Sequence, residues 1–201
     1  MKRVLSALSW LLLATALLYL TACASFYVDG NAPEVPVAEY KKPTTPGDVQ
    51  LIWEFQTKGV ANARATDYLR TRVHDQFASS GLFTTISDTP VPSGALLTAT
   101  VNNIPLSDDA ASKGFIAGLT FGIAGQTVGD GYECMLRYLS GRHDAAPLES
   151  SGKHVIYTSL GTGGPPPEAQ KMASLEEAVT TMLRQLISRT LNDLSQDPTF
   201  P

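Results

Sequence analysis

Ser150 and Lys153 have the S-x-x-K spacing with which a lysine can activate a serine nucleophile. That chemistry needs the lysine one helical turn from the serine, whereas residues 150–153 contain a glycine and are expected to form a polar loop. The glycine-rich residues 161–164 are followed by prolines, where a phosphate-binding loop has a lysine. The sequence contains no G-x-S-x-G and no H-E-x-x-H motif. We therefore expect a protein without enzymatic activity.

The residues that could bind a metal ion are not clustered in the sequence. The three histidines are scattered, and no pair of them has metal-ligand spacing: His74, His143 and His154. His74 is followed by Asp75, but adjacent residues on a helix do not face each other. Asp108 and Asp109 are expected to be solvated in a turn. We expect neither a metal site nor a cofactor.

The N-terminus has the pattern of a secretory signal. Lys2 and Arg3 precede an apolar run over residues 4–20, as a charged n-region precedes an h-region. A membrane-spanning helix needs roughly 20 apolar residues, so length alone does not exclude one. The residues that follow favour a signal peptide over a membrane-spanning helix. A leucine lies three positions before a cysteine, and a small residue lies directly before that cysteine: Leu20, Thr21, Ala22 and Cys23. This box resembles the lipobox of bacterial lipoproteins.

The resemblance implies that residues 1–22 are a lipoprotein signal peptide and that Cys23 is the lipidation site. Its thiol would receive a diacylglyceryl group, cleavage would occur before it, and its new amine would be acylated. Two or more acyl chains hold a protein stably in a membrane, at about 0.8 kcal/mol per buried methylene. In enteric bacteria an aspartate directly after the cysteine resembles an inner-membrane retention signal. This chain has Ala24 at that position instead. We expect an outer-membrane anchor with the domain facing the periplasm.

Charge and cysteine content exclude other classes of protein. Removal of the signal peptide leaves 13 of the 15 basic residues against 19 acidic ones, a net charge of −6. Such a chain is not expected to bind nucleic acid or to be attracted to anionic headgroups. Cys134 is then the one remaining thiol, so an intramolecular disulfide is not possible. We expect this cysteine to be buried and inert.

The mature chain divides into a short N-terminal segment and one domain. Residues 23–48 contain the lipidated cysteine and four prolines without a long helical or strand period, which favours a tether of on the order of 25 Å. The alternative is a loop that packs on the domain through Phe26, Tyr27 and Tyr40. Residues 49–201 are long enough for a single domain.

Periodicity predicts the elements of that domain. Alternating apolar residues predict strands at 49–56, 96–104, 132–140 and 154–160, with a short strand near 82–87. An apolar stripe predicts a helix over 62–80, with Ala65, Leu69, Val73 and Phe77 on its buried face. Ser174 and Glu177 fit a capping box that begins a last helix, which ends at Asp197. Its expected stripe excludes Gln185 and contains Leu175, Val179, Met182, Leu183, Leu186, Ile187, Leu191 and Leu194.

This order of elements predicts an α+β fold, a two-layer sandwich of a mainly antiparallel sheet with two amphipathic helices. The plan resembles several families of small envelope lipoproteins, including the lipopolysaccharide-transport, curli-secretion and exopolysaccharide-secretion lipoproteins. The resemblance is architectural, because no residue motif singles out one of these families.

A glycine-rich apolar segment at 113–126 is the candidate interaction site. As a helix it would place glycines at every fourth position on one face, and as a strand it would place alternate large apolar residues on one face. Three roles stay open: packing on the domain's own sheet, contact with a neighbouring subunit or the lipid surface, and a membrane-crossing strand in a ring of subunits. The candidate residues are Gly114, Phe115, Gly118, Leu119, Phe121, Gly122 and Gly125.

These features lead to two functional hypotheses. The first is a non-enzymatic lipoprotein that serves as a structural or assembly component of an envelope complex, with a protein partner or as a homo-oligomer. The second is a carrier that binds a lipid or another apolar ligand between the sheet and the helices. A deep apolar cavity under the last helix would favour the carrier.

Overall fold

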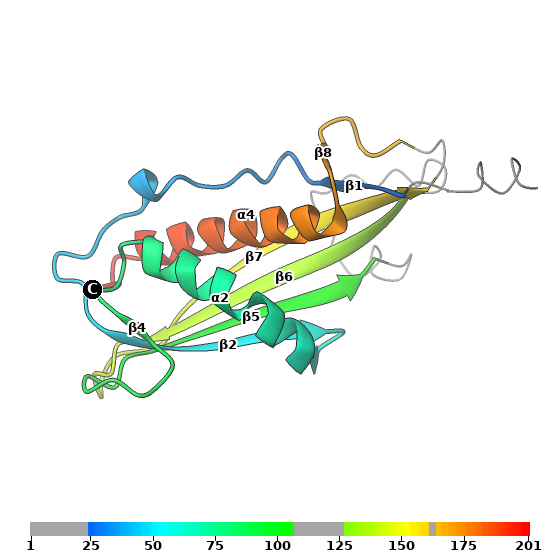
Figure 1. Cartoon of the computed structure of the whole chain (residues 1–201). Coiled ribbons are helices and arrows are strands. Elements are labelled where there is room, and N and C mark those ends of the chain that lie inside the picture. Colours follow the sequence, from blue (N-terminus) through cyan, green and yellow to red (C-terminus); the bar gives the residue numbers. More distant parts are fainter. Residues whose placement is uncertain (1–23, 107–126, 161–163) are drawn as a thin grey trace, which may run out of the picture.

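The computed structural model describes residues 24–106, 127–160 and 164–201. Within these ranges the chain forms one mixed sheet, two long helices and a short 3-10 turn (Figure 1). In chain order the elements are β1 (Ala24–Val28), η1 (Val37–Glu39), β2 (Val49–Thr57), β3 (Val60–Ala61), α2 (Ala63–Ser79), β4 (Ile86–Ser87), β5 (Leu96–Pro105), β6 (Thr127–Leu139), β7 (Leu148–Leu160), β8 (Gln170–Met172) and α4 (Leu175–Gln196).

The sheet has the strand order β3-β2-β5-β6-β7-β1-β8, with β4 beside β2. Strand β2 pairs in parallel with β5 and β4, and every other pairing among the described strands is antiparallel. Parallel neighbours need a crossover, and α2 lies in the connection between β2 and β5. The predicted α+β class and the mainly antiparallel sheet are confirmed.

Both helices cover the same face of the sheet (Figure 1). Helix α2 lies over β2, and α4 lies over β6, β7 and β1. Every second residue of the central strands points to this face, so that the core is a layer between helices and sheet. Its strand residues include Leu51, Trp53, Phe55, Leu97, Ala99, Val101, Cys134 and Leu136, all at most 7% exposed.

Two strands extend further than their hydrophobic pattern predicts. Strand β6 begins at Thr127 and β7 at Leu148, so that the predicted polar connection before His154 is partly strand. The two strands pair continuously from Thr127 opposite Ser159 to Tyr138 opposite Leu148. Backbone hydrogen bonds to a neighbouring strand can stabilise a strand whose own side chains are polar. The hydrophobic pattern of a single segment does not show which strand lies beside it.

The helices begin at the predicted residues. The Asn62 side chain accepts a hydrogen bond from the Ala65 backbone N–H, at 3.1 Å, which caps α2. At α4 the Ser174 hydroxyl accepts from the Glu177 N–H at 3.1 Å, while the Glu177 carboxylate accepts from the N–H of Ala173. The predicted α2 stripe is buried at Leu69, Val73 and Phe77. Leu175 is a wrong prediction, because it is 49% exposed.

Residues 24–48, which the sequence favours as a tether, lie against the domain as in the alternative interpretation. Residues 24–28 form β1 inside the sheet, and residues 29–48 follow α4 along its outer side (Figure 1). We call residues 29–48 the N-terminal strap. The Val35 N–H donates to the Ser188 hydroxyl at 3.0 Å, and Tyr40 is 5% exposed. The strap explains why polar residues of α4 such as Ser188 are buried, since the helix lies between sheet and strap.

Candidate functional site

The predicted site residues lie outside the described part of the chain. This holds for the lipobox with Cys23 and for the interaction segment 113–126. The described residues do fix the places where both segments leave the domain. Ala24 follows Cys23 directly, and Leu106 and Thr127 are the last described residue before and the first after the segment 113–126.

Both segments leave from one end of the sheet. Ala24 pairs with Leu160 at the start of β1, and Ser25 pairs with Ser159. Ser159 also pairs with Thr127, the first residue of β6, so that three strands meet in one row. The Leu106 N–H donates to the Gly129 carbonyl at 3.2 Å, beside the same row. We call this end of the sheet, on the right in Figure 1, the anchor end.

The space between α4 and the sheet is filled by side chains. Met182, Leu186, Ile187 and Leu191 are at most 1% exposed. Gly152 on β7 allows this close packing, because a Cβ there would lie 2.9 Å from the Thr190 hydroxyl and 3.2 Å from a Leu186 methyl. The carrier hypothesis requires a cavity at this place, and the packing does not favour it.

Polar side chains between α4 and the sheet are hydrogen-bonded to one another or to the backbone. The Ser150 hydroxyl donates to the Thr190 carbonyl at 3.0 Å, and His154 Nε2 lies 2.8 Å from Gln185 Oε1. His154 and Gln185 are 0% and 6% exposed, so the expectation that Gln185 lies outside the buried stripe is wrong. Burial lowers the pKa of His154, and its hydrogen bonds to the Gln185 side chain and the Val155 backbone oppose this shift only partly. The histidine is a structural group.

The remaining candidates for chemistry are separated or shielded. Ser150 and Lys153 lie on β7 three residues apart, so their side chains point to opposite faces of the sheet. Cys134 is a free, fully buried thiol, as predicted, and burial raises its pKa to about 12. His74 lies 3.8 Å from the Asp75 carboxylate at the surface. Among the described residues no group of histidines, cysteines and carboxylates could hold a metal ion.

A groove separates the two helices on the outer side of the domain. It encloses about 410 Å³ and contains Val73 and Leu183 at its base. Arg72 lies 2.7 Å from the Glu176 carboxylate, and Arg184 lies 2.5 Å from Glu34 of the strap. Since both guanidinium groups are paired and about half exposed, they give the groove little preference for an anionic ligand.

The buried histidine leads to a pH prediction for stability. The pKa of His154 is lower in the folded protein than the ordinary value of 6.5, so above pH 6.5 both states are neutral and stability is complete. As the pH falls below 6.5, the unfolded state takes up a proton that the folded state excludes until its own, lower pKa is reached. The free energy of unfolding should then fall by up to about 1.4 kcal/mol per pH unit.

Urea unfolding at pH 7.5, 6.0 and 5.0 measures this dependence. His154→Gln should remove the part of the slope below pH 6.5 that this histidine causes. His143→Ala, which changes an exposed histidine, should keep it. An equal slope in wild type and His154→Gln would contradict the assignment.

The described part of the chain is thus an α+β domain with one helix-covered face and a filled core, and its first described residue, Ala24, lies at the anchor end. A scan against protein-family models and a search of curated proteins both found no match. Solved structures with some similarity include a neuraminyllactose-binding hemagglutinin homologue from Helicobacter pylori, at 10% identity over 82% of this chain and 92% of that chain, with a TM-score of 0.46. PelC from Paraburkholderia phytofirmans, solved as a dodecamer, has 9% identity over 86% and 99%, with a TM-score of 0.34.

A DUF330 protein from Xanthomonas campestris has 15% identity over 76% of this chain and 85% of that chain, with a TM-score of 0.33. All three TM-scores are below 0.5, so these likenesses carry no functional conclusion. Among the described residues, neither α2 nor α4 is both long and apolar enough to cross a bilayer as a helix.

Proposed function

We propose that this protein is a lipoprotein anchored in the bacterial outer membrane through Cys23, and that its periplasmic domain is a non-enzymatic structural or assembly component of an envelope complex. One observation carries the second part of the proposal. The interior between α4 and the sheet is filled, with Met182, Leu186 and Ile187 at most 1% exposed. A domain with a filled interior acts through its surface, which favours assembly over transport of an apolar ligand.

Two surfaces are available for such contacts. The face of the sheet opposite the helices contains Ile52 and Met135, which are 46% and 52% exposed. Cross-strand ion pairs surround them, with Arg137 3.3 Å from the Glu149 carboxylate. The second surface is the predicted interaction segment at 113–126; the described residues on either side of it in the sequence, Leu106 and Thr127, belong to the anchor end. We assign the contact with a neighbouring subunit or partner to this segment.

The mass of the lipidated protein in mild detergent tests the assembly role. We expect a species larger than one 21.5 kDa chain with its detergent. Gly118→Val and Gly122→Val, made singly, should reduce that species without changing the melting temperature, because valine methyl groups prevent close approach of a neighbour.

Gly47→Val is the matched control, since a Cβ at Gly47 would meet no atom within 4 Å. If the variants at Gly118 and Gly122 lower the melting temperature of a monomer, the segment packs on its own domain. If they assemble like the wild type, the segment has no interaction role.

A further inference from the structure

The predicted lipidation site is joined to the sheet without a flexible linker. Strand β1 begins at Ala24, the residue after Cys23, and pairs there with Leu160. Consecutive Cα atoms are about 3.8 Å apart, so acyl chains on Cys23 would start within one residue of the anchor end. The bilayer that receives these chains must then lie next to the end of the sheet, because no tether separates the two.

An apolar row lies at the anchor end on the helix-covered face. Val128 pairs with Thr158, Thr158 pairs with Phe26, and Phe26 pairs with Met172, so the four residues cross β6, β7, β1 and β8. Directly paired residues share one face, and a strand spacing of about 4.8 Å gives the row a width of roughly 14 Å. The next residues along these strands, including Ser25 and Thr127, point to the opposite face. We call Val128, Thr158, Phe26 and Met172 the end row.

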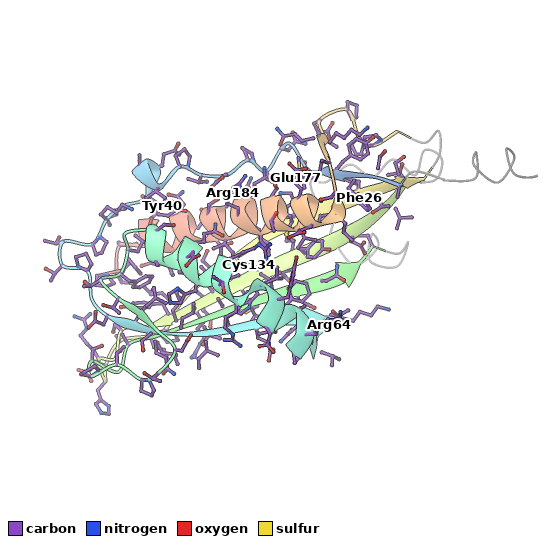
Figure 2. All side chains as sticks on the ribbon, viewed as in Figure 1. Phe26, Tyr40, Arg64, Cys134, Glu177 and Arg184 are labelled. Atoms are coloured by element: carbon purple, nitrogen blue, oxygen red, sulfur yellow. The ribbon has the colours of Figure 1, made fainter. Side chains whose placement is uncertain are left out.

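The end row is more exposed than the core to which it is joined. Val128 is 56% exposed, while Phe26 and Met172 are partly buried against the core. Two residues further into β1, Val28 is 0% exposed. Helix α4 begins beside the row with Leu175, which is 49% exposed, and Figure 2 shows Phe26 and Glu177 near this helix start. The apolar surface therefore continues past the helix toward the place where Cys23 is attached.

Two carboxylates near the end row, those of Glu176 and Glu177, accept hydrogen bonds from neighbouring groups. Glu176 accepts from Arg72 at 2.7 Å and from the Tyr68 hydroxyl at 2.9 Å. The Glu177 carboxylate accepts from the Ala173 N–H as part of the helix cap. Asp130 lies one row further into the domain, and burial raises the pKa of its carboxyl. A surface of this kind fits the neutral interface of a zwitterionic phospholipid bilayer better than a strongly anionic one.

We propose that the end row, together with Leu175, is a bilayer-contact surface that holds the domain directly on the membrane that carries the acyl chains of Cys23. The inference rests on the proposed lipidation and adds an orientation to it. The exposed side chains of Val128 and Leu175 enter the interface, while the opposite end of the domain, with η1 and Val37, points away from the membrane (Figure 1).

An environment-sensitive fluorophore tests the contact. Lipidated Val128→Cys and Leu175→Cys proteins are labelled with a nitrobenzoxadiazole maleimide and reconstituted into phosphatidylcholine–phosphatidylethanolamine vesicles. Cys134 is 0% exposed and should stay unlabelled. Val37→Cys is the matched control, because Val37 is 42% exposed and lies at the far end of the domain. We expect blue-shifted emission and quenching by spin-labelled lipid at positions 128 and 175 and water-like emission at position 37.

Intact mass of the same samples separates this inference from the proposed function. Acyl mass on Cys23 with water-like emission at 128 and 175 overturns the bilayer contact alone. Absence of acyl mass overturns the anchor and with it the contact. Equal blue shifts at all three positions would show a non-specific association and also overturn the proposed orientation.

Discussion

Cys23→Ser is expected to leave the protein unacylated and uncleaved, so that the precursor accumulates with residues 1–22 attached. A serine hydroxyl cannot replace the thiol that the lipobox resemblance requires for diacylglyceryl transfer. Anchoring should be lost completely rather than weakened, since it depends on several acyl chains at about 0.8 kcal/mol per buried methylene. Intact mass and membrane fractionation measure both effects.

The folded domain should not depend on this substitution. The sheet begins at Ala24, so residue 23 precedes the first described pairing. Thr21→Ala is a suitable control, because it keeps Leu20, Ala22 and Cys23 of the box. A wild-type protein without acyl mass that fractionates as freely soluble would contradict the anchor, the localisation and the orientation on the membrane.

Leu186→Ala is expected to cause the largest loss of stability among the substitutions considered. Leu186 is 1% exposed in α4, and its side chain packs at Gly152 of β7. A Leu→Ala change at such a position costs about 2–5 kcal/mol, because the cavity closes only partly. A domain of this size has a stability of about 5–15 kcal/mol. The melting temperature should fall by roughly 4–20 °C, measured by calorimetry or circular dichroism.

Asp193→Ala is the matched control on the same helix, because Asp193 is exposed to solvent. It should change the melting temperature little. Gln185 cannot serve as the neutral position that its polarity indicates, since its amide oxygen accepts the hydrogen bond from buried His154. Its truncation would leave a buried N–H unpaired, at a cost of about 1–3 kcal/mol. Equal effects of Leu186→Ala and Asp193→Ala would show that the buried face of α4 is assigned wrongly.

Local patterns in the sequence were sufficient for both helices and for the fold class. Leu69, Val73 and Phe77 recur once per turn, and Ser174 with Glu177 caps the last helix, so the information lies within a few residues. The lipobox resemblance is equally local, since it depends only on the neighbours of Cys23, and lipidation of Cys23 stays a prediction. The residues of the glycine segment were also selected from the sequence, and their role stays a prediction.

Contacts between distant residues decided the rest. The strap has no hydrophobic periodicity of its own. It packs on the domain through contacts with distant residues, such as the hydrogen bond from the Val35 N–H to the hydroxyl of Ser188, 153 positions away. Gln185 is buried because His154, 31 positions away, supplies its partner. The anchor end likewise depends on strand register, which pairs Ala24 with Leu160. Hydrophobic periodicity reports which side of an element is apolar, whereas polar pairing and register depend on which elements meet, and only the tertiary structure determines that.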